Sequence, residues 1–138
     1  MKFKIYESLP EEAKQIRIKV FVEEQGFQEE FDDADIGAVH IVIFENGTAA
    51  ATCRFFYSAE KKSYIIGRVA VCKEFRRNHY GATLMELAEK EILKRGGRKV
   101  ALSAQCRVAD FYEKLGYQKQ GGVYLDENCP HITMTKEL

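Results

Sequence analysis

The pattern of apolar and polar positions changes twice within the first 35 residues of the chain. Residues 2–6 alternate apolar side chains with lysines, and this period of two predicts a β-strand. From Ser8, a residue type suited to cap a helix, apolar side chains recur at helical spacing as far as Gly26, which predicts an α-helix. The acidic stretch that follows, residues 28–35, is expected to form a loop.

Three apolar stretches in the middle of the chain predict β-strands at residues 38–44, 49–57 and 64–72. The first two are joined through Asn46 and Gly47, residue types that adopt positive φ readily and so favour a tight hairpin turn. We therefore expect the first two strands to run antiparallel.

The second half of the chain alternates between helix and strand patterns. A polar loop at 73–79 leads into an amphipathic helix that starts at Tyr80 and ends at Gly96. The further elements expected are a strand at 99–104, a helix at 108–115 and strands at 117–121 and 131–136. Hairpins followed by a right-handed crossover predict an α/β fold with a mixed sheet. A chain of 138 residues fits a single domain over positions 1–138.

Composition and charge narrow the range of partners. The 21 basic residues balance the 21 acidic ones, so nothing favours nucleic acid, and an anionic ligand must be held by local groups. The chain has no apolar signal core and no run of membrane-spanning length, which predicts a cytoplasmic protein without a membrane partner. The four cysteines are widely spaced, so reduced thiols are expected and no metal site is predicted.

The loop before the long helix has the features of an anion site. The first turn of a helix carries N–H groups without intrahelical partners, and the helix dipole favours negative charge there. Arg76 and Arg77 add positive charge. Gly81, Ala82 and Thr83 are small, so a phosphate can approach the backbone. The Walker and dinucleotide patterns are absent, and the alternative is a solvated arginine pair beside a helix start.

This loop resembles the coenzyme A-binding motif of the GNAT superfamily, the Gcn5-related N-acetyltransferases. The motif reads Arg/Gln-x-x-Gly-x-Gly/Ala, and here it aligns with Arg76, Arg77, Asn78, His79, Tyr80 and Gly81. The first glycine is replaced by His79, a residue type that tolerates unusual φ better than most.

Two further resemblances extend the first over nearly the whole chain. Residues 105–117 are similar to a second GNAT signature, Asn-x-x-Ala-x-x-Leu-Tyr-x-x-x-Gly-Phe, with Gln105 at the Asn position. Residues 17–40 and 126–134 look like the small YjcF/ElaA-type branch of the superfamily. The resemblance implies the GNAT fold, a mixed, mostly antiparallel sheet of six to seven strands flanked by about four helices.

The resemblance also implies that acetyl-CoA is bound at the loop. The backbone of Val69, Ala70 and Val71 is expected to pair with pantetheine as an added strand would. The pyrophosphate is expected on the backbone N–H groups of Arg77, Asn78, His79, Tyr80, Gly81 and Ala82. The side chains expected beside the cofactor are Arg76, Arg77, Thr83, Gln105 and Phe111.

Tyr112 matches the position that often acts as general acid in GNATs. A proton donor within hydrogen-bond reach helps the thiolate of coenzyme A to leave. The alternative is that Tyr112 is a half-buried aromatic residue of the helix.

The general base is not identified by either motif. The candidates for the base or for acceptor contacts are Glu24, Gln25, Asp33, His40 and His131, and each has a solvated or structural alternative. The acidic loop at 29–35 would attract a cationic amine.

The predicted function is N-acetyltransferase activity, in which a primary amine attacks acetyl-CoA directly in a ternary complex. Two alternatives stay open: a non-catalytic acyl-CoA-binding or regulatory module, and an acetyltransferase that acts on protein lysines or N-termini. A homodimer is expected by resemblance to the superfamily.

Overall fold

The computed structural model of the protein describes residues 1–28 and 31–138. Within these residues one sheet contains the strands β1 (Lys2–Tyr6), β2 (Val39–Glu45), β3 (Thr48–Ser58), β4 (Ser63–Val71), β5 (Lys99–Gln105), β6 (Gln118–Asp126) and β7 (Cys129–Glu137). The helical segments are α1 (Glu11–Arg17), the π-helix η1 (Ile18–Glu24), α2 (Tyr80–Lys94), α3 (Ala109–Lys114) and the 3₁₀-helices η2 (Asp33–Asp35), η3 (Lys73–Asn78) and η4 (Cys106–Val108). None of the helices in this part of the chain combines the length and apolar character that a bilayer crossing requires.

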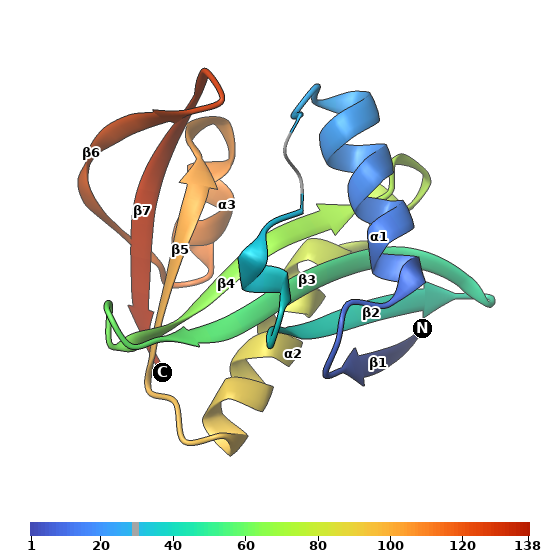
Figure 1. The fold of residues 1–138 in the computed structure, drawn as a ribbon, viewed down its shortest axis with the longest axis horizontal. Coiled ribbons are helices and arrows are strands. Elements are labelled where there is room, and N and C mark those ends of the chain that lie inside the picture. The colour runs from blue at the N-terminus through green and yellow to red at the C-terminus, as the bar shows by residue number, and fades with distance from the viewer. Residues whose placement is uncertain (29–30) are drawn as a thin grey trace.

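The strands follow the order β1-β2-β3-β4-β5-β7-β6 across the sheet (Figure 1). Neighbouring strands are antiparallel, apart from the parallel pair β4–β5, which is joined through α2. The predicted mixed, mostly antiparallel sheet is therefore confirmed, with seven strands in the described residues.

The sheet has an apolar core on each face. Ile41 and Ile43 of β2 pack in a cluster with Leu84 of α2, whereas Val42 packs in another with Ile16 of α1. Successive side chains of a strand point to opposite faces, so one strand supplies both cores. The helices α1 and α2 thus hold the centre of the sheet from opposite sides.

β4 and β5 start as neighbours and then diverge. The last residue pair between them joins Ile65 to Ala101. Beyond it, the register between β3 and β4 shifts between Thr52 and Arg54, and Arg68 has a φ of +51°. A bulge of this kind bends its strand. The bulge therefore accounts for the turn of β4 away from β5.

The single helix predicted from Ser8 to Gly26 is wrong in two respects. α1 begins at Glu11, with Pro10 in the N-cap position, because the fixed φ of proline suits a helix start. From Ile18 the segment is a π-helix. The spacing of apolar residues does not separate these two helix types over a few turns, and π-turns occur often at functional sites.

The C-terminal hairpin is longer than predicted. β6 extends to Asp126, and a turn at Glu127 and Asn128, both with positive φ, joins it to β7. All nine residues of β6 are exposed, so its sequence lacks the alternation that reveals a half-buried strand. The predicted loops at 28–35 and 73–79 each contain a 3₁₀-helix.

Candidate functional site

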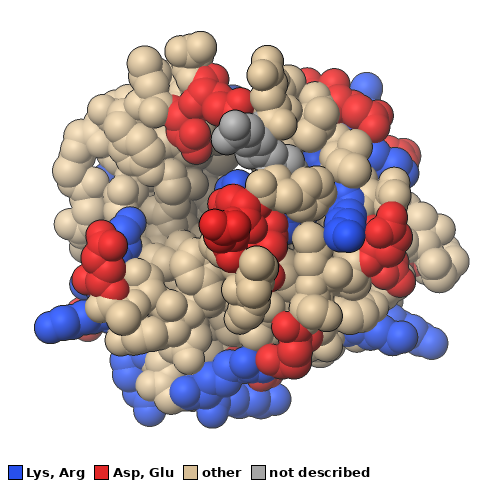
Figure 2. Space-filling model, in the orientation of Figure 1, with Lys and Arg blue, Asp and Glu red and all other residues tan. Residues whose placement is uncertain are grey.

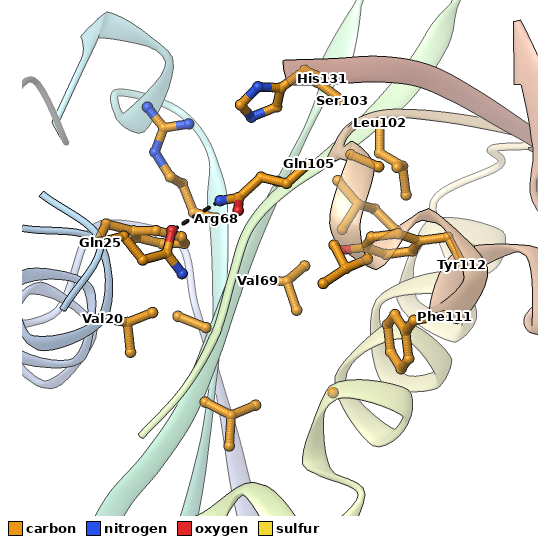
Figure 3. Close-up of a pocket in the computed structure, with 18 of the residues that line it drawn as sticks. Val20, Gln25, Arg68, Val69, Leu102, Ser103, Gln105, Phe111, Tyr112 and His131 are labelled. Atoms are coloured by element: carbon orange, nitrogen blue, oxygen red, sulfur yellow. Dashed lines mark hydrogen bonds between the residues drawn. The ribbon is translucent and has the colours of Figure 1, made fainter. Parts of the chain in front are cut away.

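A cavity of about 900 Å³ lies where β4 and β5 diverge. Residues 66–71 of β4 form one wall and residues 102–105 of β5 form the other (Figure 3). The cavity runs from the N-terminus of α2, here called the α2 end, to the β6–β7 hairpin, here called the hairpin end. Because β4 has left β5, one backbone edge of β4 faces the cavity and can pair with an extended ligand.

The N-terminus of α2 is built to receive an anion. His79, Gly81 and Ala82 line the cavity, and no side chain caps the helix. The N–H groups of the first turn are therefore not occupied by a cap. His79 precedes the helix with a φ of +58°, in the left-handed region. A Cβ atom on Gly81 would lie 3.2 Å from Cζ of Phe111, so the glycine lets α3 pack closely against this turn.

The structure divides the predicted cofactor-binding residues into two groups. Those that line the cavity are Val69, Ala70, Val71, Arg76, His79, Gly81, Ala82, Gln105 and Phe111. The side chains outside the lining are Arg77, Asn78, Tyr80 and Thr83. Asn78 and Tyr80 both donate hydrogen bonds to the carboxylate of Glu45, and the Thr83 hydroxyl donates to the His79 carbonyl. These three side chains therefore anchor the loop from outside.

Arg76 is paired with Glu24. The two terminal nitrogens of its guanidinium each lie 2.6 Å from a carboxylate oxygen of Glu24, and its Nε donates to the Val71 carbonyl at 3.0 Å. The hydrogen bonds from Arg76 lower the pKa of Glu24. The pair ties η1 to the α2 end of the cavity, and it makes Glu24 a weak base.

Tyr112 lies on α3, and its hydroxyl points toward the middle of the cavity (Figure 3). The ring packs edge-on against Phe111 and Tyr117, with centroid distances of 5.0 and 6.0 Å. Burial raises the pKa of Tyr112 well above its usual value. The hydroxyl thus stays protonated at neutral pH and can donate a hydrogen bond to a ligand atom.

Some of the residues that the sequence predicts to contact the acceptor line the cavity, and others do not. Gln25 and His131 line the cavity, and Gln105 Nε2 donates to Gln25 Oε1 at 2.9 Å, bridging β5 and the end of η1 (Figure 3). Asp33 is exposed outside the lining. His40 is fully buried on β2, away from the cavity, and burial lowers its pKa.

Carboxylates gather at the hairpin end of the cavity. Asp32, Asp126 and Glu127 line it there, and acidic side chains flank the hollow on the face shown in Figure 2. The backbone N–H of Gln28 donates to Glu127 at 3.0 Å, which ties the hairpin tip to the segment after η1. Glu29 and Glu30 of the predicted acidic loop lie outside the described residues.

Beside this end lies a group that sequence reasoning missed, here called the ionic cluster: Arg17, Asp32, Asp35, Arg54 and Arg68. Asp35 accepts hydrogen bonds from Arg17 at 2.8 Å and from Arg54 at 2.9 Å. Asp32 accepts from Arg54 at 2.6 Å and from Arg68 at 3.3 Å. Burial alone would raise the pKa of Asp35, but the two arginines hold it well below its usual range.

Asp32 and Arg68 are the members of the cluster that line the cavity. Gly67, which precedes Arg68 inside a strand pattern, is the local signal that can mark a bulge. Asp32 and Asp35 are also joined by a local capping box, but the ion pairs of the cluster join residues far apart in the sequence, so no local pattern predicts them.

Comparison with known proteins gives a family and close structural relatives. A family model described as the acetyltransferase (GNAT) domain matches residues 7–138. Protein ElaA of Escherichia coli K12 is 31% identical over 129 residues, which cover 90% of this chain and 84% of ElaA. The crystal structure of E. coli ElaA superposes with a TM-score of 0.86 at 27% identity and covers 99% of both chains.

Two other solved structures share the fold. An acyl-CoA N-acyltransferase from Pseudomonas aeruginosa has a TM-score of 0.86 at 26% identity, with 98% of each chain covered. An aminoglycoside 6′-N-acetyltransferase, solved in complex with coenzyme A, has a TM-score of 0.75 at 18% identity, with 99% of this chain and 97% of that one covered. At 18% identity this last likeness supports the fold alone.

Proposed function

The protein belongs to the GNAT family of acetyltransferases, and on this premise we propose that it transfers an acetyl group from acetyl-CoA to a primary amine, by direct attack in a ternary complex. The observation that carries the proposal is the divergence of β4 from β5. It opens a backbone edge that leads to the uncapped N-terminus of α2.

Acetyl-CoA is the cofactor of this family's acetyltransferases, and it supplies an acyl group activated as a thioester. The residues present fit it. The backbone of Val69, Ala70 and Val71 offers hydrogen-bond groups along an extended edge, as pantetheine requires. The first turn of α2, with its N–H groups and its small Gly81 and Ala82, suits the pyrophosphate.

Tyr112 is the residue that assists the leaving group. A protonated hydroxyl directed into the cavity can donate a hydrogen bond, and then its proton, to the sulfur as the carbon–sulfur bond breaks. Its raised pKa keeps the proton in place before reaction.

The hairpin end receives the amine. Asp32 is paired with Arg54 and Arg68, and Arg107 also lines the cavity, so the carboxylates of Asp126 and Glu127 are the groups that attract a cationic amine at this end. The donor and the acceptor thus enter from opposite ends, as a ternary complex requires.

The binding half of the proposal is tested by calorimetric titration with acetyl-CoA. Ala82→Glu should weaken binding by at least about 10-fold, because a carboxylate in the first turn repels phosphate while it suits the helix dipole and preserves the fold. Lys90→Gln, which removes one exposed charge elsewhere on α2, is the matched control and should bind like the wild type. Wild-type protein that does not bind acetyl-CoA at about 1 mM would end the proposal.

The transfer half is tested by thiol release over a panel of amines. Turnover of at least one primary amine is expected, and Tyr112→Phe should lower kcat by about 100-fold with little change in acetyl-CoA affinity. Binding without turnover of any amine would point instead to a non-catalytic acyl-CoA-binding module.

A further inference from the structure

His131 is held in a fixed position at the hairpin end of the cavity. It lies on the central strand of three, opposite Gln105 of β5 on one side and Tyr124 of β6 on the other. Its ring stacks on Tyr124 with a centroid distance of 6.0 Å and an interplanar angle of 26°. The residue is 7% exposed and lines the cavity. In Figure 3 the ring extends from β7 into the cavity.

One hydrogen bond determines which nitrogen of His131 carries the proton. Nδ1 lies 2.8 Å from the carbonyl oxygen of Cys129. A carbonyl only accepts hydrogen bonds, so Nδ1 is the N–H donor, and the neutral ring has its lone pair on Nε2. Nε2 has no hydrogen-bond partner in residues 1–28 and 31–138, and unlike the ring nitrogens of His40 it is not sealed from the cavity.

The other bases that the sequence predicted are engaged or lie outside the lining, and two further groups, Asp126 and His79, line the cavity as well. Glu24 is bound by Arg76, and Asp32 by Arg54. His40 and Asp33 lie outside the lining. A lone pair directed at the cavity from a rigid strand is what a general base needs.

We infer that His131 is the general base of the proposed acetyl transfer, an assignment that rests on that function. The cationic amine loses one proton to solvent before it attacks, and Nε2 takes a second proton from its nitrogen as the carbon–nitrogen bond forms. The carbon–sulfur bond breaks, and the sulfur receives a proton from Tyr112. Solvent then removes the proton from the imidazolium and returns one to the tyrosinate. The sum is amine plus thioester giving amide plus thiol.

Two substitutions separate catalysis from structure. His131→Asn places an amide nitrogen near the position of Nδ1 and can keep the bond to Cys129, but it has no nitrogen at the ε position. His131→Gln keeps a polar group near the ε position but gains no basic nitrogen. Both should lower kcat for an alkyl amine by about 100-fold or more, with acetyl-CoA affinity within about 3-fold of the wild type.

The identity of the amine supplies a second readout. Hydroxylamine is uncharged at neutral pH and loses its proton more readily once it attacks, so the same variants should lose less than about 10-fold with it. The charged groups that line the cavity with His131 are Glu24, Asp32, Arg68, Arg76, Arg107, Asp126 and Glu127.

The outcomes of these experiments test the role of His131 separately from the proposed acetyl transfer. A variant that keeps the wild-type kcat with the alkyl amine overturns the role of His131 and leaves the acetyl transfer standing. If His131→Gln loses activity and His131→Asn keeps it, the hydrogen bond to Cys129 accounts for the whole contribution of His131. That result also overturns the role of His131 as general base. Wild-type protein that acetylates no amine overturns the proposed function, and the assignment falls with it.

Discussion

The ionic cluster and the donor loop, residues 72–83, each build one end of the same cavity by different means. The cluster joins residues that lie 18 to 36 positions apart through charged side chains. The loop relies on close neighbours, such as the bond from Thr83 to the carbonyl four residues before it, and on one left-handed residue, His79. Side chains of the loop also reach Glu24 and Glu45, 33 to 52 positions away, so the loop has a local backbone signature with tertiary anchors, whereas the cluster depends on charge pairs between distant residues.

This difference matters for function. A backbone cradle accepts the same phosphate group whatever the acceptor, so a local motif suffices for it. A pocket made of side chains from η2, β3 and β4 can change its charge and shape by single substitutions. Specificity for the amine is therefore expected to reside in and around the ionic cluster.

The largest effect is expected from removal of the shared carboxylate. Asp35→Ala should lower the free energy of unfolding by about 3–5 kcal/mol, because Arg17 and Arg54, 1% and 5% exposed, lose the anion that they share. Asp33→Ala, an exposed change in the same 3₁₀-helix, is the control and should stay within about 0.5 kcal/mol. Urea unfolding measures both. Equal effects of the two changes would mean that the cluster contributes little to stability.

The stability of the donor loop and its affinity for acetyl-CoA should depend on the positive φ of His79. His79→Val should destabilise the protein by roughly 1–2 kcal/mol and weaken acetyl-CoA binding, because a β-branched residue at a φ of +58° is strained. His79→Gly removes the same imidazole without that strain and should bind acetyl-CoA almost as the wild type does. If both variants lose affinity equally, the side chain of His79 and not its conformation is what the cofactor site requires.

The same contrast explains what the sequence could reveal. Strand, loop and helix follow one another at the α2 end, so Gly81, Ala82 and Phe111 were found to line one cavity as the two motifs implied. Arg17, Asp32 and Asp35 lie in the stretch that resembles the ElaA-type branch, but Gly67 before the bulge at Arg68 is the one local sign connected with their ion pairs. The strand predicted at 117–121 was too short, because both faces of β6 are exposed as far as Asp126. The alternation of apolar and polar residues arises because one face of a strand is buried, so a strand that buries neither face does not show it.

His40, beside the ionic cluster, should make stability depend on pH. Burial lowers its pKa in the folded protein, while Asp35 opposes this and Arg17 and Arg54 add to it. As pH falls below about 6.5, the unfolded chain binds a proton that the folded protein does not, so the free energy of unfolding decreases, by at most about 1.4 kcal/mol per pH unit. Asp32 and Asp35, whose pKa values are lowered, add a further decrease only near and below about pH 4.

Urea unfolding at pH 7.5 and 5.5, round values chosen to lie on either side of the ordinary imidazole pKa, measures this decrease. His40→Leu removes the titrating ring and should flatten the slope over this range. A slope unchanged in His40→Leu would assign the pH dependence to another group.

The smallest effect concerns the pair that ties the donor loop to η1, Arg76 with Glu24. These side chains are 40% and 37% exposed, so their coupling in a double-mutant cycle should be about 0.2–1 kcal/mol. The geometry makes Arg76 a clamp between η1 and the donor loop, because Glu24 and the Val71 carbonyl hold its guanidinium.

A clamp role for Arg76 and a direct contact with phosphate predict opposite effects of Glu24→Gln on acetyl-CoA affinity. If Arg76 acts as a clamp, Glu24→Gln and Arg76→Ala both weaken acetyl-CoA binding by up to about 5-fold, and the double variant is no worse than either. If Arg76 binds phosphate, Glu24→Gln releases its guanidinium and tightens binding, while Arg76→Ala alone weakens it. We expect the first result, because a guanidinium already held by a carboxylate gains little from a second anion unless that pair first breaks. Calorimetric titration of the four proteins measures the sign directly.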